Sequence, residues 1–323
     1  MKPVIPILLV AGLLYSCTGK RTERGDSVTG QSGDMYGIAF NVLVDEANDN
    51  YDIFTMNLDG TEQRNITNNP DVAWTYLSHD STVFFLSDRD TVSRSYFLYE
   101  MDYSGEHVRK IADIRLSDSW MGVRKDGKEL IVTPHPSVDS VLYVIDRQGN
   151  ILQKIWAGTL YASNPEFSPD GQRIAFVGKN KPSKREPGYR EEIYTMNADG
   201  SGLKQLTHYP PGDTTAEWWA YMAGPPRWHP TDGYITYHSK QGGKYSLYAV
   251  SEDGNRHWKL TDNPQEEGWH AWSPDGNWLA IELFDKEQTQ FQIGLMNWRT
   301  KELAILTDTG YAYQQAPNFF IKK

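Results

Sequence analysis

The chain has one cysteine, Cys17, among 323 residues, so it cannot form an internal disulfide. It also has no excess of positive charge, since 32 Lys and Arg face 42 Asp and Glu and the formal net charge is −10. A surface for nucleic acid needs a basic stripe that meets the phosphate backbone, and no such run occurs. The sequence therefore excludes an internally disulfide-bonded scaffold and indicates a partner other than nucleic acid.

A long hydrophobic run is missing too. The apolar stretch from Val4 to Leu14 is too short for a permanent transmembrane helix. It follows the positive Lys2 and ends in Leu-Tyr-Ser-Cys, which resembles the lipobox of bacterial lipoproteins. We expect a lipoprotein signal peptide at residues 1–16, lipidation of Cys17 and a flexible polar tether over residues 17–34. An ordinary signal peptide with an incidental cysteine is the alternative.

What the sequence does contain is a repeat. One unit is an apolar strand that runs into a turn, as in "IFTMNLDG", "FLYEMDYSG", "LYVIDRQG", "IYTMNADG", "LYAVSEDG" and "IGLMNWRT". Between these copies lies a second unit, an aromatic residue and a turn followed by another strand, as in "EFSPDGQRIAFVG" and "AWSPDGNWLAIEL". The Asp-Gly pairs suit tight turns because both residues tolerate positive φ. Four short strands repeated roughly every 44–54 residues predict an all-β, six-bladed β-propeller.

The two ends of the chain complete each other. "YGIAFNVLVDEANDNYDIFTMN" near the N-terminus matches the second and third strands of a unit, and "QQAPNFFI" near the C-terminus matches a first strand. We therefore expect a propeller over residues 35–323 in which the C-terminal strand pairs with the N-terminal strands. This pairing removes exposed sheet edges.

The segment "SPDGQRIAFVG…IYTMNADGSGLKQLT" resembles the repeat of TolB-like propellers, a WD40-like repeat that also occurs beside the hydrolase domain of prolyl-oligopeptidase-related peptidases. The resemblance implies the fold and leaves function open, because its motif residues serve turns and packing. Two features of those relatives are not recognisable in the sequence: the extra N-terminal domain of TolB and the Gly-x-Ser-x-Gly elbow of the peptidases.

Strand parity places the regular turns, strand one to two and strand three to four, on one face. We expect that face to be scaffold and the opposite, variable-loop face to carry function. Aromatic residues with nearby carboxylates and amides can stack on sugars or grip a peptide. The candidate ligand-binding residues are Glu217, Trp218, Trp219, Tyr221, Trp269, His270, Tyr313, Gln314 and Gln315, and the mouth segments also hold Trp74, Trp120, Tyr161, Asn164 and Tyr311.

The sequence gives no catalytic motif. The eight histidines form neither an H-E-x-x-H pattern nor a Cys/His cluster, so no metal and no cofactor are expected. A distant likeness to oligogalacturonate lyases would imply a manganese ion held by histidines and a glutamine, which directs attention to His270 and Gln314 or Gln315. A glycosidase would instead need a carboxylate pair, for which Glu217, Glu266 and Glu267 are candidates.

Two functions are thus weighed. The first is a non-catalytic, monomeric envelope lipoprotein that binds a protein partner or a glycan through its variable-loop face. The second is a carbohydrate-active enzyme, a metal-dependent lyase or a glycoside hydrolase, with its site at the channel mouth. The absence of a catalytic motif favours the first. The tether starts "TGKRTER" and lacks an acidic export run, so a periplasm-facing outer-membrane location is favoured over the cell surface.

Overall fold

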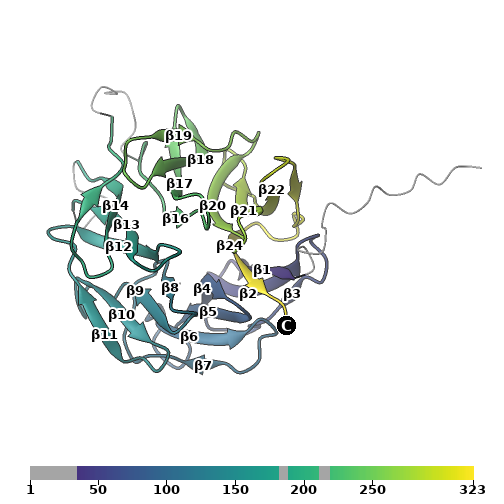
Figure 1. The fold of residues 1–323 in the computed structure, drawn as a ribbon. Coiled ribbons are helices and arrows are strands. Elements are labelled where there is room, and N and C mark those ends of the chain that lie inside the picture. The colour runs from purple at the N-terminus through teal and green to yellow at the C-terminus, as the bar shows by residue number, and fades with distance from the viewer. Residues whose placement is uncertain (1–34, 182–187, 211–218) are drawn as a thin grey trace, which may run out of the picture.

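The computed structural model describes residues 35–181, 188–210 and 219–323. Their strands form six four-stranded sheets arranged as blades around a central axis (Figure 1). The predicted all-β six-bladed propeller is confirmed. The predicted signal peptide, Cys17 and the tether, together with Glu217 and Trp218, lie outside the described residues. In the part of the chain that is described, no helix is long and apolar enough to cross a membrane.

The blades follow one another along the chain. Blade 1 holds β1 (Tyr36–Asp45), β2 (Asn50–Asn57), β3 (Arg64–Asn65) and β24 (Gln314–Ile321); blade 2 holds β4 (Ala73–His79), β5 (Thr82–Ser87), β6 (Phe97–Asp102) and β7 (Arg109–Lys110). Blade 3 holds β8 (Gly122–Arg124), β9 (Glu129–Val132), β10 (Leu142–Asp146) and β11 (Ile151–Ile155); blade 4 holds β12 (Tyr161–Phe167), β13 (Arg173–Lys179), β14 (Glu191–Asn197) and β15 (Lys204–Gln205). Blade 5 holds β16 (Arg227–Trp228), β17 (Tyr234–Gln241), β18 (Lys244–Ser251) and β19 (His257–Lys259); blade 6 holds β20 (Glu266–Trp272), β21 (Trp278–Phe284), β22 (Phe291–Asn297) and β23 (Leu303–Ile305).

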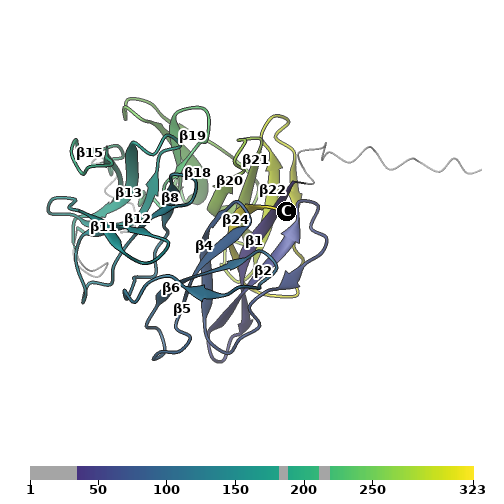
Figure 2. The ribbon, with the colours of Figure 1, turned by 60° about the horizontal axis from the view of Figure 1, so that its bottom comes forward.

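Closure of the ring follows the prediction. Strand β24 pairs antiparallel with β1, and Tyr36 lies opposite Ile321. The sheet order β24-β1-β2-β3 therefore gives blade 1 its inner strand from the C-terminal end and its other three from the N-terminal end. The turned view again places the C-terminus beside β1 and β2 (Figure 2).

The middle strands of the blades are apolar on both faces. The sequences "IAFV" in β13 and "WLAIELF" in β21 are buried at nearly every residue. A propeller blade packs against a neighbour on each side, so its middle strands have no solvent face and read as continuous hydrophobic runs. The buried clusters accordingly combine residues of adjacent blades, as Phe40 and Ile293 do between blades 1 and 6.

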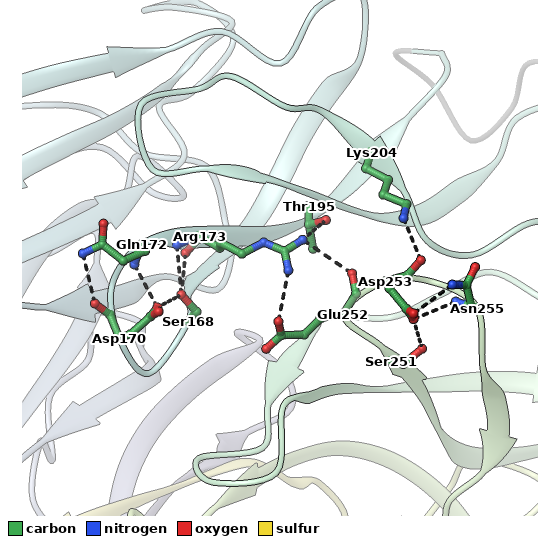
Figure 3. A network of polar contacts seen from close by, with 10 residues as sticks. All are labelled: Ser168, Asp170, Gln172, Arg173, Thr195, Lys204, Ser251, Glu252, Asp253 and Asn255. Atoms are coloured by element: carbon green, nitrogen blue, oxygen red, sulfur yellow. Dashed lines mark hydrogen bonds and ion pairs between the residues drawn. The ribbon is translucent and has the colours of Figure 1, made fainter.

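The regular turns of both kinds share one face, as predicted. In Figure 3 the turn after β12 is closed by the Ser168 hydroxyl, which donates to the Asp170 carboxylate at 2.6 Å. Gly171 adopts a φ of 69° there, a conformation that glycine tolerates without strain. Arg173, after this turn, forms an ion pair of 3.2 Å with Glu252 in the turn that joins β18 and β19 of the next blade. A strand one–two turn and a strand three–four turn are thus in contact on the same side.

Four of the inner strands carry a β-bulge, and polar groups of the preceding blade bond to each of these strands. Asn41 of β1 accepts from the amide of Thr75 at 2.7 Å and donates to its carbonyl at 3.0 Å. At blade 4 the amide of Asn164 donates to the hydroxyl of Ser119 at 2.8 Å. At blade 1 the amide of Ala316 donates to the carboxylate of Glu282 at 3.1 Å. These contacts lock the inner strands around the axis.

Candidate functional site

Aromatic rings fill the axis on the side of the variable loops. Trp74 lies in β4, Trp120 lies two residues before β8 and Trp269 lies in β20, so three blades contribute. The ring centroids of Trp120 and Trp269 are 4.7 Å apart, and those of Trp74 and Trp269 are 6.3 Å apart. Tyr76 packs on Trp120 at 4.0 Å. These four residues, the aromatic plug, unite three of the predicted mouth residues, but Trp74 and Trp120 are buried and only Trp269 is partly exposed.

Below the plug, one arginine connects the inner strands. Arg227 of β16 is buried, and its guanidinium donates to the carbonyls of Tyr76 at 3.1 Å and His270 at 3.3 Å. It also pairs with Glu166 of β12 at 3.4 Å, and it lies over the Trp120 ring at 5.6 Å from the centroid. A single side chain therefore contacts four other blades across the channel.

Burial governs the charges at this centre. Desolvation raises the pKa of Glu166, and Arg227 opposes that shift. Desolvation also lowers the pKa of Arg227, which Glu166 opposes. Sequence reasoning missed this pair, although the signal was present. Glu166 in "EFSPDG" and Arg227 in "RWHPTDG" occupy the same repeat position in neighbouring blades, immediately before the shared aromatic residue.

The remaining part of the channel forms a cavity of about 240 Å³, which we call the axial cavity. Its lining comes from the C-terminal ends of the inner strands and the following turns: Tyr76, Leu77, Ser78, Val123, Glu166, Phe167, Ser168, Pro169, Arg227, Trp228, Pro230, Ala271, Trp272, Ser273, Pro274, Asn318 and Phe319. The axial cavity therefore lies on the face of the regular turns. This differs from the expectation that the turn face is scaffold alone. The reason is that the aromatic plug occupies the other half of the channel.

His270 is a packed residue between blades 5 and 6. Its Nε2 lies 2.7 Å from the hydroxyl of Thr236, which also accepts a hydrogen bond from the Trp272 indole at 3.1 Å. The side chain is 3% exposed, and burial, reinforced by Arg227 and His238, holds its pKa well below the ordinary value. His270 is therefore a neutral, hydrogen-bonded group of the core.

The glutamines of β24 do not join His270. The Nε2 of Gln314 donates to the carbonyl of Asp308 at 2.7 Å. Gln315 instead hydrogen-bonds to the buried carboxyl of Glu282, whose pKa is raised to about 8 by burial. Tyr313 stacks on Phe291 at 5.1 Å. These predicted residues support the closing strand and its neighbour, blade 6.

A second hollow, the lateral pocket, opens between blades 4 and 5 near the variable loops. It has a volume of about 490 Å³ and is lined by Glu192, Thr207, His208, Pro210, Tyr221, Tyr237, Gln241, Tyr248, His257, Trp258 and Lys259. Among the described residues, Tyr221 is the one predicted ligand-binding residue that lines this pocket. It packs edge-on against Tyr209 at 5.4 Å. The Nζ atom of Lys240 lies 5.9 Å from the centroid of the Trp219 ring.

Potential metal ligands gather elsewhere. In the described ranges, the group of at least three His, Cys, Asp or Glu ligand atoms close enough to share an ion is Asp102, Glu106 and His107. His107 and Glu106 are exposed, and the Asp102 carboxylate already bonds to Ser104, His107 and backbone amides. The donors proposed for manganese do not fit that ion, because His270 Nε2 bonds to Thr236 and the Gln315 side chain bonds to Glu282.

Comparison with known proteins agrees with this architecture. The family model described as "TolB beta propeller domain" matches residues 95–320. An uncharacterized peptidase, YuxL, of Bacillus subtilis (strain 168) is 27% identical over 137 residues, which cover 40% of this chain and 19% of the relative. The Tol-Pal system protein TolB of Anaeromyxobacter dehalogenans (strain 2CP-C) is 30% identical over 105 residues, which cover 32% of this chain and 22% of the relative. Both matches thus span about a fifth of the relative's length.

Among solved structures, TolB from Acinetobacter baumannii superposes with a TM-score of 0.67 over 89% of this chain and 67% of that one, at 15% identity. At this identity the likeness concerns the fold. The family match extends over most of the chain and covers blades 3 to 6 entirely. The chain belongs to the TolB β-propeller domain family.

Proposed function

We propose that this chain is a non-catalytic propeller of the bacterial envelope that binds a protein partner at the axial cavity. The observation that carries the proposal is the cavity itself, whose floor is held by the Arg227 contacts to Tyr76, His270 and Glu166. A rigid, partly open hollow lined by aromatic residues, prolines and a few polar groups suits an inserted side chain or peptide turn. The TolB family and the relative named as a Tol-Pal system protein support binding to another protein.

The carboxylates considered for glycoside hydrolysis have structural partners. Glu267 is fully buried, accepts from the Thr261 hydroxyl at 2.6 Å and also bonds to Asn263. Glu266 accepts from the amide of Tyr245. Since a general acid or nucleophile must reach its substrate, the buried Glu267 is not placed for glycosidic cleavage, and the partly exposed Glu266 cannot form a working carboxylate pair with it. With the manganese donors also engaged in the core, the geometry favours binding over the enzyme alternative.

The proposal includes the location. We infer export through the signal peptide of residues 1–16, lipidation at Cys17 and a tether over residues 17–34 that holds a monomeric propeller at the periplasmic side of the outer membrane. The support is the lipobox-like sequence and the likeness to an envelope-system protein. In this arrangement the lipid supplies membrane attachment and the propeller supplies recognition.

A matched pair of variants tests the binding site. Val123 lines the axial cavity and is partly exposed, so Val123→Arg places a long charged side chain in the hollow. Val138, 47% exposed in the loop between β9 and β10, provides the control Val138→Arg. Both purified variants should melt as the parent does. We expect cross-linking in native envelopes to yield a defined protein adduct with the parent and with Val138→Arg, and to lose it with Val123→Arg. Equal adducts from both variants would refute the axial site.

A further inference from the structure

The lateral pocket is walled by aromatic side chains of blade 5. Tyr237 of β17 and Tyr248 of β18 are direct cross-strand partners, and their rings stack with centroids 6.1 Å apart and an interplanar angle of 28°. Trp258 of β19 and Tyr221, in the loop before β16, extend the wall. The pocket therefore offers several ring faces and edges within one hollow of about 490 Å³, a volume suited to one or two sugar rings.

Two tyrosine hydroxyls of this wall, those of Tyr237 and Tyr248, have no hydrogen-bond partner among the described residues. The repeat places a tyrosine in the third strand of four blades, and in three of them the hydroxyl has a protein partner. Tyr99 donates to the Arg89 carbonyl at 3.1 Å, Tyr143 to the Asp139 carboxylate at 2.7 Å, and Tyr194 to the Gln205 amide oxygen at 3.0 Å.

Tyr248 is the blade 5 member of this series. Within residues 35–181, 188–210 and 219–323, its hydroxyl has no hydrogen-bond partner, and neither has that of Tyr237. Tyr237 is 4% exposed, so its hydroxyl is a nearly buried polar group that lines the pocket. Polar groups in such places are normally satisfied by protein, water or ligand. The tyrosine hydroxyl at this repeat position thus has a protein partner in three blades, and it is available to a ligand in blade 5, where it faces the pocket.

The charged groups of the pocket, by contrast, are engaged. The Glu192 carboxylate accepts from the Thr207 hydroxyl at 2.6 Å and from the Tyr209 amide at 2.6 Å. Lys259 pairs with Asp262 at 2.6 Å. A charged ligand would have to displace these partners. An uncharged ligand can bind without displacing them. Its hydroxyl groups would bond to the tyrosines, and a flat apolar face would stack on the rings.

We infer that the lateral pocket is a carbohydrate-binding site for a neutral pyranose, one or two sugar rings long. The apolar face of the sugar stacks on the aromatic wall, and its hydroxyl groups exchange hydrogen bonds with Tyr237 and Tyr248. This site is separate from the axial cavity, which lies on the opposite, turn face. It gives the variable-loop face a ligand of its own and does not depend on the protein partner.

The test uses single-hydroxyl variants. The intact chain is screened by isothermal titration against neutral di- and trisaccharides (cellobiose, maltotriose, mannotriose, galactobiose and diacetylchitobiose) and against digalacturonate as the charged comparison. We expect a neutral sugar to bind, and Tyr248→Phe and Tyr237→Phe each to weaken it about five- to tenfold, the effect of one lost hydrogen bond. Tyr194→Phe, the same change at the equivalent position of blade 4, should leave the affinity unchanged.

Three results would overturn the inference: binding of none of the neutral sugars, preference for digalacturonate, or equal affinity of Tyr248→Phe and Tyr194→Phe. Tyr248 is partly exposed, so its variant is expected to fold even if Tyr237→Phe does not. Val123→Arg separates the two sites. It should abolish the protein adduct and leave sugar binding intact, so that failure of one proposal is visible independently of the other.

Discussion

The guanidinium of Arg227 and the carboxylate of Glu166 lie 3.4 Å apart, although the two residues belong to neighbouring blades. The arginine side chain is 7% exposed and the glutamate side chain 22%. A buried charge is tolerated when a partner and hydrogen bonds compensate it, and this arginine also has two carbonyl acceptors.

Removal of the arginine should therefore destabilise the ring. We expect Arg227→Met to lower the free energy of unfolding by about 3–5 kcal/mol, because it leaves a carboxylate beside the axis without its cation. The double variant Arg227→Met/Glu166→Gln should recover part of that loss. Urea denaturation measures both, and a double variant no more stable than the single one would contradict the assignment.

Glu282 should make stability fall as pH rises. Its carboxyl has a pKa of about 8 in the folded protein against an ordinary 4.5, so the folded state holds a proton that the unfolded state releases. Between pH 4.5 and pH 8 the contribution of Glu282 to the free energy of unfolding declines as pH rises, by up to about 1.4 kcal/mol per pH unit. Glu282→Gln removes the titrating group. The unfolding free energy of this variant should fall less steeply between pH 5 and pH 8 than that of the parent, and parallel profiles would refute the prediction.

Asn41 should be needed for the lock between blades 1 and 2. Its side chain is fully buried and bonds to both backbone groups of Thr75. Asn41→Ala leaves a buried amide and a buried carbonyl without partners, which should cost about 2–4 kcal/mol. Asn48→Ala is the control, since Asn48 is exposed and bonds locally to Asp45. Thermal unfolding of the two variants should differ clearly, and similar melting temperatures would argue against the lock.

His270 should behave as a structural residue. We expect His270→Ala to destabilise the fold by about 2–4 kcal/mol through a cavity and the lost bond to Thr236. The melting temperature of the parent should be the same in excess manganese chloride and in EDTA. A manganese-dependent rise that vanishes in His270→Ala would revive the lyase alternative.

Cys17→Ser tests the anchor. If Cys17 carries the lipid, the variant should move from the membrane fraction to the soluble fraction of cell extracts, because the acyl chains supply the membrane affinity. Immunoblotting of separated fractions measures the distribution. Retention of the variant in the membrane fraction would contradict lipidation at this residue.

The fold could be predicted from the sequence because every blade contains a recognisable copy of the repeat. Turn residues such as Asp170 and Gly171 recur with the strands, and the alignment of both termini with one unit predicted the pairing of β24 with β1. Tertiary structure adds little to such local signals, so the architecture followed directly from periodicity.

The site was harder to predict because the axis collects single residues from different blades. Trp74, Trp120 and Trp269 do meet, but their mutual packing fills the mouth that they were expected to line. The likeness to oligogalacturonate lyases directed attention to His270, but its partner Thr236 lies in another blade, which no local pattern reveals. Glu166 and Arg227 could have been found by comparing charges at equivalent repeat positions.

The pairing of β24 with β1 has a consequence for how the protein reaches its folded state. Tyr36 and Ile321 are partners across 321 − 36 = 285 residues of chain. During synthesis, β1 to β3 must wait for β24, and the edge of β1 can meanwhile pair with other chains. Contacts between such distant residues form slowly, so ring closure is expected to be the late step of folding. Mutations in β24 should therefore raise aggregation during folding even when the finished propeller is stable.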